Sequence, residues 1–435
     1  MIFSIILALS MLAAGGWFIK SRRYAPGLFN VLWGGVFLSC CREFSMEQYG
    51  HTLLLLSLMV IMVNAGYFIA LKRKPKISVR QRLEHKGGVL DEKMLQVFLI
   101  VACVIFAWYA IRTLWVFGLD LGQIRGHNNV SSENSAFGGQ LDTILFYGVA
   151  TPLIYTAMLI FAYSFSQNVK IQPLTYGLAL GALLLQLITT GGGRSIILRG
   201  ALFFVAAVLM RPISWKSLPR KKLITYISVC VGMVLLVELL TLVRNKGDIT
   251  FAGQMLEYIR GSVGHMQYRL TRPMGPQYYG GLVTFGGFFY YPLKVLKMLT
   301  GWEIQTSNEL LAYLQEYRQI QLFDQTKAYN ALVPSAFYFF YDNGYVGVIG
   351  LSALHGFLME RAERTCRKPS FLGFVMWATC IYMIVYSPLD GVLWTFRHPT
   401  TIICCVLLCK LLYRPVENTR RRKDESIDQC DRSDL

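Results

Sequence analysis

Residues 52–71 read TLLLLSLMVIMVNAGYFIAL, a run of twenty residues without a charged side chain. A helix needs about 20 mostly apolar residues to cross the hydrocarbon core of a bilayer. Outward from this run, the sequence contains ten further segments of the same apolar character. The eleven candidate spans are residues 2–19, 25–41, 52–71, 94–117, 143–165, 173–190, 196–210, 223–243, 344–359, 371–388 and 400–413. The pattern predicts an all-α polytopic membrane protein, in which residues 331–341 form an outer, partly buried lead-in to the ninth span.

The composition of the whole chain agrees with this prediction. Of 435 residues, 54% are hydrophobic and only 16% are charged, whereas soluble domains carry roughly 25% charged residues. The chain has 43 Lys and Arg against 25 Asp and Glu, a net charge of +18, and its mean hydropathy is +0.42. A chain so poor in charge could not cover a soluble surface, which excludes a soluble enzyme, a disordered chain and an ordinary DNA-binding domain.

The basic residues between the candidate spans predict the orientation, because cytoplasmic loops carry an excess of Lys and Arg. With the N-terminus outside and the C-terminus in the cytoplasm, 28 of the 43 Lys and Arg lie on the cytoplasmic side. We therefore expect one integral membrane domain over residues 1–413, which includes a long outer loop over 244–330. The polar segment 414–435 is expected to be a disordered cytoplasmic tail.

Cysteine and histidine give no indication of a metal or a disulfide framework. The ten Cys are scattered without a C-x-x-C motif, and none lies in the loop 244–330. The six His show no spacing typical of metal ligands. No metal and no other cofactor is therefore expected.

Two short outer segments contain candidate anion-binding residues. Residues 189–195, TTGGGRS, form a glycine-rich turn before a predicted helix. Ser195 could cap that helix, and Arg194 would lie where the helix N-terminus favours an anion. The alternative for Arg194 is a cation at the membrane interface with no ligand. The polar segment 118–142 contains Arg125, and the alternative there is a flexible connector.

The outer loop 244–330 combines basic residues with Tyr and Gly. Its basic residues are Arg244, Lys246, Arg260, Arg269, Arg272, Lys294, Lys297, Arg318 and Lys327. Arginine side chains bind phosphate oxygens bidentately. The sequence Thr306-Ser307-Asn308-Glu309 predicts a capping box at the start of a helix, with Leu310, Leu311, Leu314 and Tyr317 as its apolar stripe. That stripe either packs on the membrane domain or lies in the interface.

Several titratable residues lie within or beside the predicted spans, and the function of each has two possible interpretations. Glu238 falls inside the eighth candidate span, where it is either functional or paired with an interior arginine. Asp342 precedes the ninth span, and Asp390, Arg397 and His398 lie in the last outer turn. Each of these could serve acid–base chemistry or merely lie at an interface.

The motifs together resemble those of the bacterial oligosaccharide repeat-unit polymerases, the O-antigen or capsule polymerase (Wzy) family, and more distantly those of the O-antigen ligases. The resemblance rests on the turn 189–195, on the long loop after the eighth span, on residues 329–332 (YNAL) and on residues 341–347 (YDNGYVG). Ligases tend to have His directly before the Asn, where this chain has Tyr329. That departure favours the polymerase.

The resemblance implies about 11 transmembrane helices in a GT-C-like glycosyltransferase architecture in the bacterial cytoplasmic membrane. It implies polymerisation of undecaprenyl-diphosphate-linked repeat units on the outer face, with a chain-length regulator and a flippase as protein partners and no nucleic acid. The diphosphate leaving group needs fixed cations, for which Arg194, Arg269 and Arg272 are the expected catalytic residues. His265 is the first candidate for the general base and Asp342 the second. Arg125, Arg260, Asn330 and Asp342 are expected to bind substrate.

Three alternatives to a polymerase remain. An O-antigen ligase shares the topology. A lipid-linked glycan flippase would place its cations near the bilayer midplane and have short loops, and a non-catalytic scaffold would not need a cluster of outer arginines.

Overall fold

The structure is a computed structural model of the chain. It describes residues 2–72, 89–118, 139–167, 169–193, 195–210, 250–271, 279–315, 318–322, 325–329, 332–367, 370–393 and 397–414, with a few single residues between them. The chain divides into two compact units, which are described separately below. The first comprises Met1–Arg73, Arg194–Arg364 and Trp377–Thr400, and the second comprises Lys74–Gly193, Thr365–Met376 and Thr401–Leu435.

Long apolar helices dominate the described residues. Among the residues that the structure describes, four helical segments are long and apolar enough to cross a membrane, namely Ile2–Lys20, Glu47–Lys72, Glu92–Phe117 and Leu141–Gln167. Their outer faces carry large exposed apolar side chains, such as Ile2 at 72% exposure and Trp115 at 89%. Side chains of this kind are stable on a protein surface when lipid, rather than water, surrounds them. The protein is therefore helical with the features of an α-helical membrane protein.

Most of the predicted spans coincide with helices of the structure. These helices are α1 (Ile2–Lys20), α2 (Tyr24–Ser39), α3 (Gly50–Lys72), α5 (Glu92–Phe117), α8 (Thr151–Gln167), α9 (Pro173–Thr189), α10 (Ser195–Met210), α15 (Ser335–Cys366), α16 (Phe371–Tyr386) and α17 (Arg397–Leu412). The predicted eighth span, 223–243, lies largely outside the described residues. The total of eleven spans and the GT-C-like architecture stay predictions.

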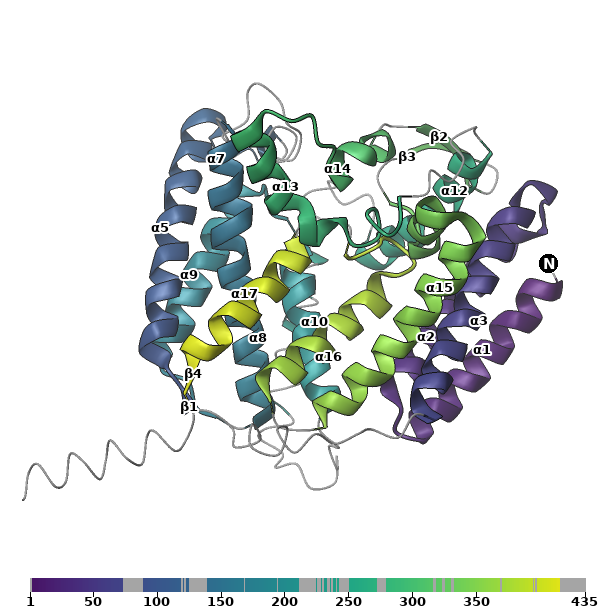
Figure 1. Ribbon diagram of the computed structural model, residues 1–435, viewed down its shortest axis with the longest axis horizontal. Helices are drawn as coiled ribbons and strands as arrows, with labels where there is room; N and C mark the ends of the chain where they lie inside the picture. The colour runs from purple at the N-terminus through teal and green to yellow at the C-terminus, as the bar shows by residue number, and fades with distance from the viewer. Residues whose placement is uncertain are drawn as a thin grey trace, which may run out of the picture. The chain divides into compact units, whose positions relative to one another are not determined.

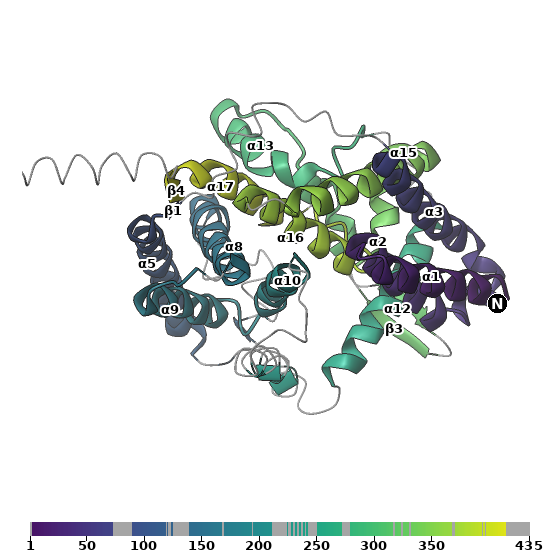
Figure 2. The ribbon, with the colours of Figure 1, turned by 90° about the horizontal axis from the view of Figure 1, so that it is seen from below.

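In the first unit, α1, α2, α3 and α15 lie side by side (Figures 1 and 2). Glycines allow α3 and α15 to touch backbone to backbone. A Cβ atom on Gly66 would lie 1.9 Å from the carbonyl oxygen of Ala353, and a Cβ on Gly356 would lie 1.8 Å from that of Val63. Since no side chain fits at either position, small residues at this contact fix the approach of the two helices.

Helix α15 begins before the predicted ninth span and is kinked where the two segments meet. Asn343 has φ −150° and Gly344 has φ 59°, so the helical backbone is interrupted at these two residues. The left-handed region is accessible to Gly344 because it lacks a Cβ atom. The lead-in predicted over residues 331–341 therefore forms the first part of this helix from Ser335 onward, and its residues from Val333 onward are buried.

The first unit also contains the described part of the predicted outer loop, which is largely structured. It forms α12 (Phe251–Leu270), α13 (Gly286–Thr300), the short α14 (Ser307–Leu310) and a hairpin of β2 (Arg318–Leu322) and β3 (Gln325–Tyr329). The strands are antiparallel, with Arg318 opposite Tyr329.

The capping box predicted at Thr306 is confirmed, since its side chain accepts from the Glu309 amide while Glu309 accepts from the Thr306 amide. The helix that follows is much shorter than the apolar stripe predicts. It ends at Leu310, a 3-10 turn covers Ala312–Gln315, and β2 begins at Arg318. Leu311 and Leu314 are buried, so the stripe packs inside the protein, while Tyr317 lies outside the described residues.

In the second unit, α5, α8 and α9 lie side by side (Figures 1 and 2). A π-helical segment, Ile144–Ala150, leads directly into α8. Asp142 accepts hydrogen bonds from Tyr109 at 2.8 Å and from Arg112 at 3.1 Å. Strand β1 (Val89–Leu90) pairs with β4 (Tyr413–Arg414).

Candidate functional site

Helix α12 carries three of the predicted site residues. Its first turn is capped by Thr250, whose hydroxyl accepts from the Gly253 amide at 3.2 Å. Residues 261–267 are buried on every side. The close packing depends on Gly261, because a Cβ atom there would lie 2.2 Å from the ring of Tyr329. This part of the predicted loop is therefore an interior helix.

His265 and Arg269 form a hydrogen-bonded pair inside this buried region. Arg269 Nε donates to His265 Nε2 at 3.0 Å, and His265 Nδ1 lies 3.1 Å from the carbonyl oxygen of Leu332. A carbonyl oxygen only accepts, so Nδ1 carries the proton and Nε2 presents its lone pair to Arg269. The pair is one helical turn apart on α12, which places both side chains on the same face.

The charge state of His265 follows from this geometry. The pKa of His265 is lowered to about 4, chiefly by burial and also by the positive charge of Arg269, while the hydrogen bond to Leu332 opposes the shift. The imidazole is therefore neutral at pH 7. Its side chain is fully buried, and that of Arg269 is only 8% exposed. Tyr329 packs edge-on against the imidazole, with 5.7 Å between ring centroids.

These contacts bear on the predicted role of His265 as a general base. The lone pair on Nε2 already accepts a hydrogen bond from Arg269 Nε–H, and Nδ1–H donates to the carbonyl oxygen of Leu332. A base must have a free lone pair near the proton that it removes. The geometry favours a different role, in which the imidazole holds the guanidinium of Arg269 in one orientation.

Asp342 is engaged by the backbone. Its carboxylate accepts from the Val283 amide at 2.9 Å and from the Thr284 amide at 2.7 Å, and the residue is fully buried. The turn that it holds contains Gly280 and Gly281, both with positive φ. The carboxylate thus anchors this turn to α15 and, in this geometry, contacts backbone on both oxygens.

Arg260 lies apart from the His265–Arg269 pair. Its Nε donates to the carbonyl oxygen of Ser39 at 3.0 Å, beside the end of α2. Nine residues separate Arg260 from Arg269, which on a helix means about 14 Å along the axis and roughly opposite faces. The structure therefore brings His265 and Arg269 together and separates Arg260 from them.

Sequence reasoning missed Glu43, which lies near Arg260. This residue starts a 3-10 turn, Glu43–Ser45, directly after α2, and it is only 2% exposed. Neither carboxylate oxygen has a side-chain hydrogen-bond partner within the described ranges. Burial raises the pKa of the Glu43 carboxyl, while the positive charges of Arg260 and Arg42 oppose this shift. The sequence offered little to single it out, since Glu43 is one of two acids, with Glu47, in the short connection between the second and third spans.

Four predicted site residues, Arg125, Arg194, Arg272 and Asn330, lie outside the described residues. The glycines before Arg194 do adopt the expected backbone, since Gly191 has φ 60° and Gly192 has φ 72°. Helix α10 starts at Ser195, which is thus its first helical residue.

Other polar residues of the first unit are also hydrogen-bonded. Arg199, which the motifs did not single out, is buried in α10 and donates to the Tyr382 hydroxyl at 2.7 Å. His398 Nε2 lies 3.1 Å from the Thr379 hydroxyl. Asp390 accepts from the Tyr338 hydroxyl at 2.7 Å. In the part of the chain that the structure describes, no three His, Cys, Asp or Glu residues gather closely enough to hold a metal ion.

Comparison with known proteins adds no relative: no protein-family model, curated protein or solved structure matches this chain.

Proposed function

We propose that this protein is a glycosyltransferase of the bacterial cytoplasmic membrane that polymerises polyprenyl-diphosphate-linked repeat units into O-antigen or capsular polysaccharide on the outer face. The observation that carries the proposal is the fixed cation on α12. Arg269 is nearly buried and its Nε is bound to a neutral His265. The sequence motifs that resemble the repeat-unit polymerases lie at 329–332 and 341–347, on either side of the start of α15.

The proposed reaction requires such a cation. A hydroxyl oxygen of the acceptor glycan bonds to the anomeric carbon of the donor, and the bond from that carbon to the diphosphate oxygen breaks. The diphosphate leaves with the bonding electrons, and the hydroxyl proton of the acceptor passes to the departing diphosphate or to water. Negative charge grows on the leaving oxygen in the transition state, and a preorganised guanidinium stabilises it there more than in the ground state.

His265 is the positioning residue in this proposal. The imidazole is neutral and its tautomer is set by the Leu332 carbonyl, so Arg269 keeps its full charge and a single orientation. Arg272 follows Arg269 by three positions, and Asn330 precedes Leu332 by two. We include both residues, with Arg194 and Arg125, as candidates for contacts to the diphosphate or the sugars.

The test is a deletion of the gene in its host, complemented with variants. Arg269→Ala should leave single repeat units on the lipid anchor and abolish long chains, since removal of one transition-state donor typically costs about 10²–10³ in rate. Arg269→Lys should retain little activity, because the fork geometry is lost. His265→Gln, which can still accept from Arg269, should retain shortened chains.

Lys297→Ala is the matched control, because it removes an exposed cation from the same loop. It should give the wild-type ladder, and immunoblots should show equal membrane levels of all variants. The ladder of the deletion strain distinguishes the rival functions. Complete absence of surface glycan would indicate a flippase or a ligase, and an unchanged ladder would indicate a scaffold. Long chains made by Arg269→Ala would remove Arg269 from the proposed mechanism.

A further inference from the structure

Helix α13 presents an apolar stripe to the outside of the protein. Phe289 is 49% exposed, Leu299 is 76% exposed, and Trp302, just after the helix, is 64% exposed. Val295 and Leu296 lie between them and are also exposed. At about 100° per residue, Phe289, Val295, Leu296 and Leu299 fall within about 120° of the helix circumference, so they share one face. From Phe289 to Leu299 the stripe runs for about 15 Å along the helix axis.

The opposite face of α13 packs closely against other segments of the first unit. A Cβ atom on Gly286 would lie 2.2 Å from Ser307, and one on Gly287 would lie 2.2 Å from the Thr395 carbonyl oxygen. The Gly287 amide also donates to the Leu393 carbonyl oxygen at 3.0 Å. Since these contacts admit no side chain, α13 cannot rotate about its axis to bury the apolar stripe.

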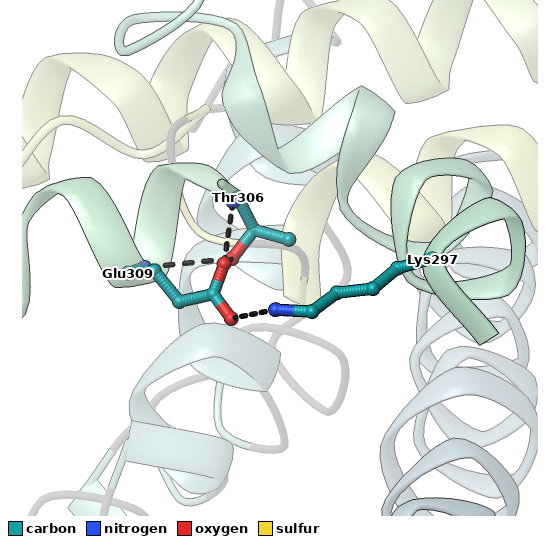
Figure 3. A network of polar contacts seen from close by, with 3 residues as sticks. All are labelled: Lys297, Thr306 and Glu309. Carbon is teal, nitrogen blue, oxygen red and sulfur yellow. Dashed lines mark hydrogen bonds and ion pairs between the residues drawn. The ribbon is translucent and has the colours of Figure 1, made fainter. Parts of the chain in front are cut away.

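The two lysines of α13 point away from the stripe. Lys294 lies over the Tyr290 ring, 5.6 Å from its centroid. Lys297 forms an ion pair of 3.1 Å with Glu309, which also accepts from the Thr306 amide in the capping box (Figure 3). The polar residues of α13 are thus turned toward α14, and the apolar residues are turned outward.

This arrangement is the reverse of an amphipathic helix on a water-soluble domain. In water, a contiguous apolar stripe is unfavourable, because the cost of hydration grows with the apolar area left exposed. The outward faces of α1 and α5 show the same pattern of exposed apolar side chains, and both helices have the length and composition of membrane spans. Trp302 ends the stripe, and tryptophan favours the boundary between acyl chains and headgroups.

We propose that α13 lies in the membrane interface, with its apolar stripe embedded in phospholipid acyl chains. The leaflet is the one at the end of the first unit that carries α12, α13 and α14 (Figure 1). Lys294 and Lys297 then lie at the level of the lipid headgroups, as lysines near a membrane boundary commonly do. The proposal holds whatever reaction the protein performs, because it depends only on the surface of α13.

The experiment places a small fluorescent amino acid at position 299, on the stripe, in the full-length protein reconstituted in phospholipid nanodiscs. The matched control carries the same fluorophore at Glu303, an exposed residue beyond the end of the helix. Two quenchers are compared: a phospholipid with a nitroxide high on its acyl chain, and aqueous iodide. The label at 299 should be quenched several-fold more strongly by the lipid nitroxide than by iodide, and the label at 303 should show the reverse.

Two results would overturn the proposal. Equal iodide quenching at 299 and 303 would mean that water covers the stripe. Protection of the 299 label from both quenchers would mean that protein covers it, either another part of this chain or a second molecule. A label at Leu296 provides an independent reading of the same face, and its quenching should agree with that at 299.

Discussion

Helices α12 and α13 belong to the same predicted outer loop, yet they distribute polar and apolar residues in opposite ways. Helix α12 buries His265 and Arg269 in the interior, whereas α13 exposes Phe289 and Leu299. Helix α12 also buries Val263 and Met266, so the polar pair lies in a mixed interior. The contrast teaches that one loop can hold a polar pair inside the protein on one helix and expose an apolar face on the next, which is the kind of face that the proposed interfacial position of α13 requires.

The largest expected effect concerns the packing of α12. Gly261→Ala places a methyl group 2.2 Å from the Tyr329 ring and should destabilise the protein by about 3 kcal/mol. The reason is that both α12 and the hairpin would have to move. Thermal unfolding in detergent, followed by a thiol-reactive dye that labels the buried cysteines as they become exposed, measures the change.

A double-variant cycle and a matched glycine control test this explanation. In a Tyr329→Ala background, Gly261→Ala should cost much less, because the ring is gone. Gly177→Ala in α9, where a Cβ atom would meet no neighbour within 4 Å, should be neutral or stabilising by up to about 1 kcal/mol. Equal losses in both backgrounds would show that the ring is not the obstacle.

Acid should weaken the polar interior of α12 through His265. The pKa of His265 is lowered to about 4 in the fold, against 6.5 for an unperturbed histidine. The unfolded chain therefore binds the proton more tightly, and stability falls as the pH drops from 6.5 toward 4. A shift of this size corresponds to about 3 kcal/mol.

The measurement is the apparent melting temperature at several pH values for the wild type and for His265→Gln. The wild type should lose stability progressively between pH 6.5 and 4, and the variant should lose less over the same range. Identical pH profiles would mean that His265 does not contribute to acid sensitivity.

The carboxylate of Asp342, which anchors the turn at 280–285 to α15, should give a slightly smaller effect when it is changed. Asp342→Asn replaces one accepting oxygen by an amide group that faces a backbone N–H donor. We expect the free energy of unfolding to fall by about 2 kcal/mol. One charge-assisted hydrogen bond is lost, and one buried backbone N–H group is left without an acceptor. Glu303→Gln, at an exposed position, is the control and should not change the melting temperature. A stable Asp342→Asn variant would show that the turn is held by other contacts.

The smallest effects are expected at the border between α13 and α14 (Figure 3). Thr306→Ala removes an N-cap and should cost about 1 kcal/mol. Lys297→Ala removes an ion pair whose side chains are 43% and 48% exposed, so solvent screening limits the loss to about 0.5 kcal/mol. High salt should reduce the Lys297 effect further and leave the Thr306 effect unchanged. A larger cost for Lys297→Ala than for Thr306→Ala would contradict this order.

The sequence was a good guide wherever a local pattern determines the structure. Uninterrupted apolar runs such as 52–71 predicted helices that the structure contains, and the spacing of Thr306 and Glu309 predicted the capping box. The i, i+4 spacing of His265 and Arg269 is also local, and it could have predicted their pairing. Each of these features depends on residues less than one helix apart.

Features that depend on distant segments were out of reach. The length of α14 was overestimated because the apolar stripe 310–317 has helical spacing, while the chain turns into the β2–β3 hairpin instead. The proton position on His265 depends on the carbonyl of Leu332, which lies 67 residues away. The sequence motif around Asp342 suggested a catalytic carboxylate, but in the structure this carboxylate accepts hydrogen bonds from two backbone amides. Glu43 stood in a short connection with no motif around it.

The glycine contact between α3 and α15 has a consequence for how this sequence can change. Gly66 and Gly356 each face the backbone of the other helix, so the two positions act as a reciprocal pair in which neither tolerates even a methyl group. Around them, outward-facing positions such as Ile61 and Leu354 meet no such limit. We therefore expect substitutions among apolar residues to be tolerated at the outward-facing positions of these helices and to be excluded at the two glycines. The contact between α3 and α15 would then be preserved while the sequence around it changes.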